Sequence, residues 1–151
     1  MAHSRTGIRT KTITAVTGLT LTGSNVFDWN LNAQAENKLP SLTVMVARSP
    51  EQISDDIDNE LGVLEVRDLP ITIEVREVQA ATDSHADLLT AIDDICEDVE
   101  IALTGNAALA VAIIDITLMT TEIEMVGGGE YPMVVATQEW IARYSVDRTA
   151  P

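Results

Sequence analysis

The feature that most constrains the fold is a stripe of apolar residues between positions 84 and 103. Its members recur every three or four positions, which is the spacing of one helical face: Leu88, Ile92, Ile95, Val99 and Leu103. Leu89 and Cys96 widen the stripe, and Ser84 with Asp87 three residues later is typical of a capped helix start. Gly105-Asn106 is typical of the end of a helix. We therefore predict a helix over about 84–103 that packs this face on a sheet.

Segments with strand character lie on both sides of this helix. The predicted strands are 26–29, 42–46, 63–78, 109–121 and 133–146. Pro70 either divides the third strand or marks a sheet edge, because proline cannot donate to a hydrogen-bond ladder. A modest helix is predicted over 4–17. Residues 30–39 are a predicted loop, and 49–62 are an acidic excursion with room for one helical turn after Pro50.

The segment from Glu122 to Pro132 is predicted to be a mobile hairpin tip, because it holds three glycines and a proline. It also carries four apolar side chains: Ile123, Met125, Val126 and Tyr131. Apolar residues on such a tip are typical of a surface that orders on binding. We predict that these four residues contact a neighbouring subunit or an adjacent protein ring.

The predicted elements follow the order α, β, β, β, α, β, β, with hairpin connections dominant. This order favours the α+β class, with a mostly antiparallel (mixed) sheet of about five strands and two main helices packed on one face. The chain of 151 residues has the length of one ordinary domain, so a single domain is predicted over 1–151.

The chain carries a formal charge of −15, from 24 acidic and 9 basic residues. Such a balance disfavours binding to DNA or to anionic membranes, which needs clustered Lys and Arg. The charge is unevenly spread, since residues 77–142 hold 13 acids and no Lys or Arg. The longest apolar run, Ala107–Ile114, is too short to cross a bilayer, which takes about 20 residues. No secretory signal is apparent, so a cytoplasm-like compartment is expected.

Residues 1–27 have the opposite composition, with Arg5, Arg9 and Lys11 and no acid. Arg5 and Arg9 are four residues apart and therefore share one helical face. One interpretation is a solvated amino-terminal helix. The other is a helix that docks against the acidic surface of an adjacent subunit or ring.

No group of residues has the spacing of a catalytic, cofactor or metal site. Asp83-Ser84-His85 has the residue types of a hydrolase triad, but adjacent positions at a helix start do not converge as a triad must. The acidic run 55–60 lacks a calcium loop's glycine and glutamate spacing, and the carboxylates of 93–98 lack histidine partners. Gly127–Gly129 lacks the lysine of a phosphate loop. Cys96 is expected to be a buried small hydrophobe. We therefore expect no catalysis, no cofactor and no metal.

The order of several sequence landmarks resembles a known family. A basic amino-terminal helix leads to Val26-Phe27-Asp28-Trp29 and then to Leu39-Pro40-Ser41-Leu42-Thr43-Val44. Next come Leu69-Pro70-Ile71-Thr72-Ile73-Glu74-Val75, the helix with Asp87-Leu88-Leu89 and Ile92, and the ending Glu139-Trp140-Ile141-Ala142-Arg143-Tyr144. Over nearly the whole chain this order is similar to that of the tail terminator, or tail-completion, proteins of long-tailed bacteriophages.

The resemblance implies a non-enzymatic subunit that forms a ring of about six copies. Such a ring caps the tail tube, stops its polymerisation and offers an attachment surface to the neck of the head. The implied partners are copies of itself, the tail tube protein, a neck or connector protein and, in a contractile tail, a sheath protein. DNA would pass through the ring without specific binding, which an acidic chain suits. The implied location is the tail or neck of the virion, after assembly in the host cytoplasm.

Two other functions fit the same residues. Another ring component of the neck, such as a head-completion or connector protein, would share the assembly role. A small intracellular α+β binding module belongs to a different class. The number of subunits separates the classes, because such a module is expected to be a monomer or a dimer.

Overall fold

The computed structural model describes residues 3–29, 40–53, 64–78, 85–126 and 132–147. These residues form three helices and six strands, and the α+β class predicted from the sequence is confirmed. The elements are α1 (Ser4–Val16), β1 (Val26–Asp28), β2 (Ser41–Val46), β3 (Gln52–Ile53), β4 (Leu64–Val78), α2 (His85–Gly105), α3 (Ala107–Ala112), β5 (Asp115–Val126) and β6 (Met133–Asp147).

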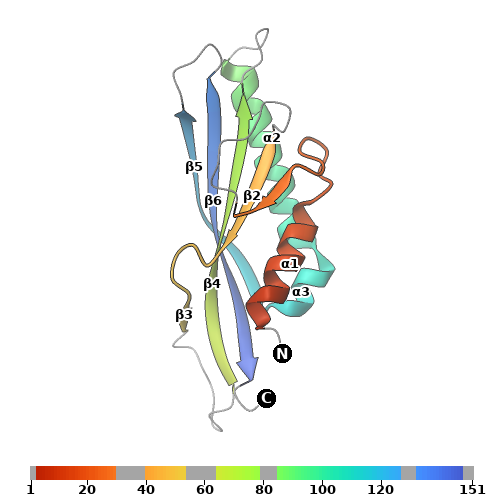
Figure 1. Cartoon of the computed structure of the whole chain (residues 1–151), viewed down its shortest axis with the longest axis vertical. Helices are drawn as coiled ribbons and strands as arrows, with labels where there is room; N and C mark the ends of the chain where they lie inside the picture. The colour runs from red at the N-terminus through yellow and green to blue at the C-terminus, as the bar shows by residue number, and fades with distance from the viewer. Residues whose placement is uncertain (1–2, 30–39, 54–63, 79–84, 127–131, 148–151) are drawn as a thin grey trace.

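All six strands belong to one mixed sheet with the order β1-β2-β4-β6-β5, and β3 pairs with β4 off this path (Figure 1). The β1–β2 pair is parallel, and the other pairs are antiparallel. The centre consists of β4 and β6, each 15 residues long, which pair from Leu64↔Asp147 to Val78↔Met133. One end of the sheet is therefore β5, and the other end is the much shorter β1.

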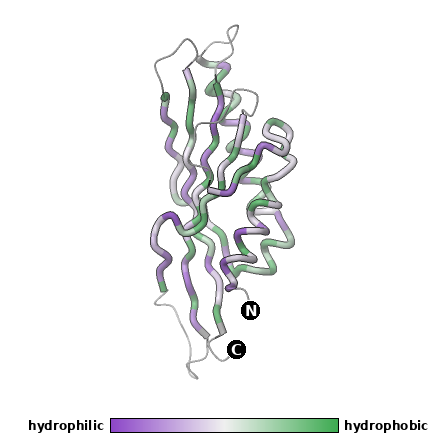
Figure 2. Tube along the Cα trace, viewed as in Figure 1, coloured by the Kyte–Doolittle hydropathy of each residue, from purple (hydrophilic) through white to green (hydrophobic). Residues whose placement is uncertain are grey.

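The three helices lie together on one face of the sheet (Figure 1). The predicted stripe of α2 is buried there, from Leu88 to Leu103, and Cys96 is buried with it. Polar and apolar positions alternate along the strands (Figure 2), and the buried positions of β4 and β6 that complete the core are Leu69, Ile71, Ile73, Val75, Val134, Ala136, Trp140, Ala142 and Tyr144. Leu89 was predicted to widen the stripe but is exposed, because it lies about 100° around the helix from Leu88.

Residues 109–112 were predicted as the start of a strand, and this prediction is wrong. They belong to the short helix α3, which begins after Asn106. The Asn106 side chain accepts a hydrogen bond from the Leu109 backbone N–H at 2.8 Å, which satisfies one of the free donors of the first turn. The alanine-rich sequence of α3 also favours a helix. The following strand, β5, therefore begins only at Asp115.

The predicted hairpin tip is shorter than expected, because β5 continues to Val126 and pairs there with Met133. The remainder of the tip, 127–131, lies outside the described residues. The acidic excursion differs as well. Gln52–Ile53 is a short strand that pairs with β4, rather than a helical turn after Pro50, and 54–62 lies outside the described residues.

Pro70 does not divide β4, which is one continuous strand. Its carbonyl accepts a hydrogen bond from the Ala47 backbone N–H at 2.8 Å, so both backbone groups of Pro70 point toward β2 and away from β6. On that side β2 has ended at Val46, and β3 pairs only with Arg67 and Asp68. The missing N–H of Pro70 therefore falls in the gap between β2 and β3. Pro70 marks a local edge inside the sheet, and the ladder to β6 is intact.

Candidate interaction surface

The strand β5 is an edge strand of the sheet, with β6 as its one neighbour. It is 12 residues long, and along it only Ile116 and Leu118 are half-buried while all other side chains are exposed. About half of the backbone N–H and C=O groups of such a strand point away from its one neighbour. β5 therefore combines an open backbone edge with side chains exposed on both faces.

Four of the exposed side chains on β5 are large and apolar. Their exposed fractions are 59% for Met119, 44% for Ile123, 47% for Met125 and 40% for Val126. Ile123 and Met125 stand opposite Ala136 and Val134, which are buried, so they share the helix-covered face of the sheet. Val126 stands opposite Met133 on the other, open face. The apolar exposure is therefore a property of both faces of this strand.

A β-bulge between Leu118 and Thr120 divides β5 into two parts. The extra residue is Met119, which has no partner in the register with β6. After the bulge, pairing is uninterrupted from Thr120↔Glu139 to Val126↔Met133. The run 120–126 is thus a regularly paired piece of edge strand.

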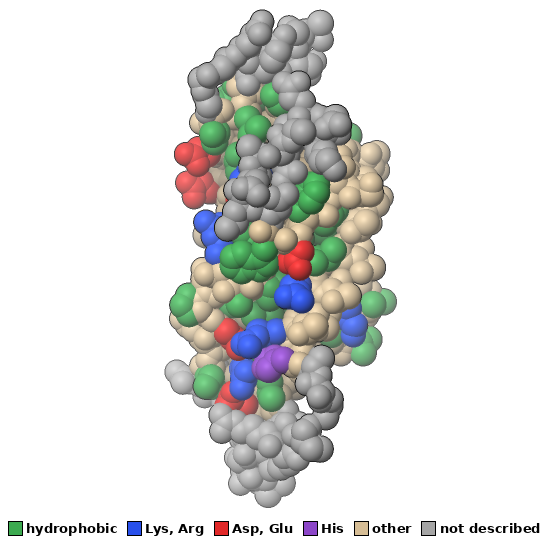
Figure 3. All heavy atoms as spheres, in the orientation of Figure 1, with side chains coloured by type: hydrophobic (Ala, Val, Ile, Leu, Met, Phe, Trp, Pro, Cys, Tyr) green, Lys and Arg blue, Asp and Glu red, His purple; other side chains and the backbone are tan. Residues whose placement is uncertain are grey.

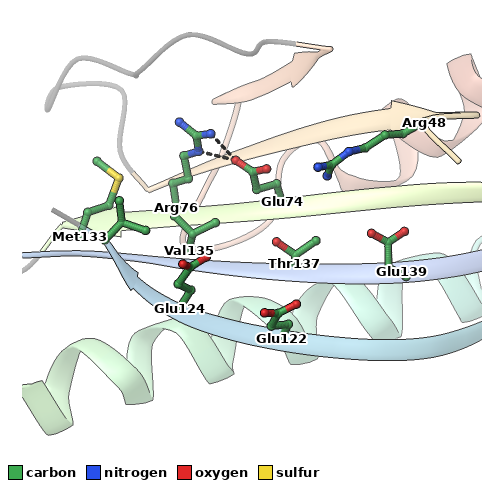
Figure 4. Close-up of a pocket in the computed structure, with 10 residues that line it drawn as sticks. Arg48, Glu74, Arg76, Glu122, Glu124, Met133, Val135, Thr137 and Glu139 are labelled. Carbon is green, nitrogen blue, oxygen red and sulfur yellow. Dashed lines mark hydrogen bonds and ion pairs between the residues drawn. The ribbon is translucent and has the colours of Figure 1, made fainter.

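The open face of the sheet beside this run is hollowed and rich in charge. A cavity of about 430 Å³ is lined by Arg48, Glu74, Arg76, Glu122, Glu124, Val126, Met133, Val135, Thr137 and Glu139 (Figure 4). Arg76 forms an ion pair with Glu74, and Glu139 accepts a hydrogen bond from the Thr72 hydroxyl at 2.7 Å. Glu122 and Glu124 project from β5, and neither has a hydrogen bond or an ion pair with another described residue.

The basic residues predicted to dock outside the chain are on α1, where two of them form ion pairs within it. Arg5 contacts the Glu51 carboxylate at 2.8 Å, and Arg9 lies 3.6 Å from Asp28. Lys11 forms no ion pair with a described residue. In the view of Figure 3, Lys or Arg and His side chains gather on the lower half of the molecule, near the start of α1.

Glu51 joins α1 to the sheet. One of its oxygens contacts both Arg5 at 2.8 Å and Arg67 at 3.5 Å, and the other accepts a hydrogen bond from the Tyr144 hydroxyl. His3, the N-cap of α1, accepts a hydrogen bond from the Arg5 backbone N–H. Through Glu51, the first turn of α1 is therefore linked to the segment before β3 and, further, to β4 and β6.

The predicted interface residues are not brought together. Arg5, Arg9 and Lys11 are on α1, whereas Ile123, Met125 and Val126 are near the end of β5, and Figure 1 shows this part of β5 at the outer edge of the sheet, away from α1. Tyr131 lies outside the described residues. The two groups therefore belong to two separate surfaces, and the contacts predicted for each stay predictions.

Cys96 is buried, as predicted. Burial first, and then the nearby charges of Glu100 and Asp93, raise the pKa of its thiol to about 11. The thiolate, which is the reactive form, is therefore disfavoured. Within the described ranges, no cluster of three or more His, Cys, Asp or Glu side chains is placed to hold a metal ion. The acidic run 55–60, Asp83 and Ser84 lie outside those ranges.

Three features of these surfaces were not predicted from the sequence. The first is the set of contacts that Glu51 makes with Arg5, Arg67 and Tyr144. The others are the bulge at Met119 and the lack of described partners for Glu122 and Glu124. The alternation in 120–126 contained a signal for the last of these, because it places both acids on one face and Ile123 with Met125 on the other.

Comparison of the chain with protein-family models and with curated proteins returns no match. Among the helices that the structure describes, none combines the length and apolar character needed to cross a bilayer.

Proposed function

We propose that this protein is a structural assembly subunit of the tail-terminator type, which forms a ring of about six copies on the end of a tail tube and receives the neck. The observation that carries the proposal is the β5 edge. Folded monomers usually protect sheet edges with charged side chains, lysine above all, or with proline, bulges or short strands. β5 contains no lysine or proline and is 12 residues long, and beside its bulge and its acidic side chains it exposes Met119, Ile123, Met125 and Val126.

The electrostatics of the chain support the same role. Its net charge of −15 would repel DNA passing through a ring and so prevent adhesion. The exposed acids Asp93, Asp94 and Glu97 of α2 form no ion pairs with described residues, so this helix presents unneutralised carboxylates. A ring of such subunits would have acidic surfaces wherever α2 faces solvent.

The proposal is tested by measuring the mass of the protein in assemblies extracted from virions and by imaging it on purified tail tubes. We expect about six copies per assembly and density that caps the tube end. Ile123→Glu with Met125→Glu should abolish capping, because it places two charges in the exposed apolar part of β5.

The matched control is Ile101→Glu with Val111→Glu, which makes the same change at exposed positions of α2 and α3. This control should cap tubes like the unaltered protein. A monomer or dimer in the extracted assembly contradicts the proposal, and so does normal capping by the β5 double variant. Binding to the neck without binding to tubes would favour another ring component of the neck.

A further inference from the structure

We propose, on the basis of the assembly role above, that β5 receives an extended segment of a partner protein in which basic side chains alternate with apolar ones. The segment would add to the sheet as a new outer strand beside the run 120–126. The partner is thus defined by its chemistry: an unfolded or edge segment with Lys or Arg at every second position and apolar residues between them.

The backbone of β5 supplies the first requirement. Strand addition needs a regular edge whose outward N–H and C=O groups are free. The run 120–126 has unbroken register with β6 on its inner side, and β5 terminates the sheet on its outer side. The bulge at Met119 sets the lower limit of this regular edge, because a bulge locally disrupts pairing.

The side chains of the run supply the pattern that the partner must match. Thr120, Glu122, Glu124 and Val126 lie on the open face, since their partners in β6 are Glu139, Thr137, Val135 and Met133. Ile123 and Met125 lie on the opposite face and are exposed. An added strand places its side chains directly opposite these residues, face by face. The added strand therefore needs one kind of side chain opposite Glu122 and Glu124 and another kind opposite Ile123 and Met125.

The charge on the open face selects basic side chains. Glu122 and Glu124 have no partners among the described residues, and the 77–142 segment that contains them has no Lys or Arg. The adjoining cavity holds four glutamates against two arginines, and Arg76 is already paired with Glu74. Opposite charges across a strand pair stabilise it, so Lys or Arg fits opposite Glu122 and Glu124.

The same two acids disfavour a second copy of β5 as the added strand. Antiparallel pairing of two copies centred on Ile123 would set Glu122 of each copy opposite Glu124 of the other. Like charges directly opposite are destabilising. A partner strand with a sequence different from that of β5 is therefore favoured at this edge.

Binding of short fluorescent peptides to the full-length protein tests this inference by anisotropy at low ionic strength. The three peptides alternate Lys with Val, alternate Glu with Val, or carry the Lys and Val residues in scrambled order. We expect the alternating basic peptide to bind at least about tenfold more tightly than either of the others. Equal affinity for the alternating and scrambled basic peptides would overturn the proposal, because it would indicate a purely electrostatic contact.

Two variants separate the site from the general acidity of the chain. Glu122→Lys with Glu124→Lys should shift the preference to the acidic alternating peptide. Asp93→Lys with Asp94→Lys makes the same change in charge on the exposed face of α2 and should retain the preference for the basic peptide. If the two variants behave alike, β5 is not the binding site.

Backbone pairing is tested with two further basic peptides, each N-methylated along one edge. Methylation of the edge that faces β5 should weaken binding at least about tenfold, and methylation of the other edge should leave it unchanged. Equal effects would rule out strand addition. Rings that form on tubes without any peptide binding would refute this inference and leave the proposed function standing, whereas peptide binding without rings would do the reverse.

Discussion

Tyr144 shows how burial, together with a hydrogen bond to Glu51, sets a residue's response to pH. Burial first, and then the hydrogen bond to Glu51 and its charge, raise the pKa of the Tyr144 phenol to about 12, although Arg67 acts in the opposite direction. An unfolded tyrosine titrates near 10. Between these values the unfolded chain loses its phenol proton and the folded chain keeps it. The stabilisation from the neutral phenol is therefore complete below pH of about 10 and is lost as the pH rises to about 12.

The corresponding prediction concerns Tyr144→Phe. The absorbance titration of phenolate in the native protein should contain a component near pH 12 that this variant lacks. The free energy of unfolding of the unaltered protein should also fall more steeply between pH of about 10 and 12 than that of the variant. Loss of a component near pH 10 instead would mean that Tyr144 is not in this hydrogen bond.

Ala47 stores strain at the point where the chain leaves the sheet. Its φ is +61°, in the left-handed region that disfavours residues with a side chain. Its N–H bonds the Pro70 carbonyl, so the conformation is fixed by the sheet. Ala47→Gly should therefore raise the free energy of unfolding by about 0.5–1 kcal/mol, after the greater freedom of glycine in the unfolded chain is subtracted.

Ala110→Gly on α3 is the matched control for that substitution. Ala110 is exposed in a helix, where glycine is unfavourable by about 1 kcal/mol. The two identical changes should therefore shift the denaturation midpoint in opposite directions. A lower midpoint for both would show that Ala47 is not strained.

At the scale of elements, α2 holds the helical layer on the sheet, and Ile92 is a test of its packing. Ile92 is fully buried, whereas Ile101 on the same helix is 63% exposed. Ile92→Ala should lower the free energy of unfolding by about 2–5 kcal/mol, since it removes buried methylene groups and leaves a cavity. Ile101→Ala should change it by less than about 0.5 kcal/mol. Equal effects in chemical denaturation would contradict the assigned face of α2.

The elements differ in how far their sequences predict them. The stripe of α2 has an unambiguous helical period over five positions, and all five are buried. The segment 107–112 is a short apolar run, and periodicity alone cannot distinguish a buried strand from a helix in such a run. Asn106 caps the start of α3. Because Gly105-Asn106 was interpreted only as the end of the preceding helix, this capping role was not predicted. Because of the glycines at 127–129, residues 122–126 were predicted as part of a mobile tip, whereas they belong to β5 and pair with β6 up to Val126.

The exposure of Ile123 and Met125 depends on topology and could not be predicted from their local sequence. Their alternation with Glu122 and Glu124 assigns the two faces of a strand but not its place in the sheet. β5 is an edge because β6 takes the position between it and β4. The prediction that these residues are available for contact therefore rested on the glycines beside them, while the observed reason is the order of the strands.

At the scale of the whole molecule, the net charge of −15 should make stability depend on salt. Asp93, Asp94 and Glu97 are exposed on one helix without ion pairs to described residues, so they repel one another. Added salt screens this repulsion. We expect the melting temperature to rise with ionic strength. Asp93→Asn with Asp94→Asn should raise it at low ionic strength and reduce the salt effect.

Glu51→Gln is the control for that prediction, because it also removes negative charge. Glu51 is paired with Arg5 and Arg67, so its neutralisation should lower the melting temperature. If both variants raise the melting temperature equally, net charge alone governs stability and the pairing of individual acids is unimportant.

The position of β6 has a consequence for the timing of synthesis. β6 follows β4 and β5 along the chain, yet it lies between them in the sheet. On the ribosome, the stretch from Val78 to Met133 takes roughly 3–11 s to translate at about 5–20 residues per second. During that interval β4 and β5 have no common neighbour, and the pairing with β6 that makes β5 a regular edge does not exist. A nascent chain therefore cannot present this paired edge until β6 has emerged, and under the proposed assembly role unfinished copies would be kept out of the assembly.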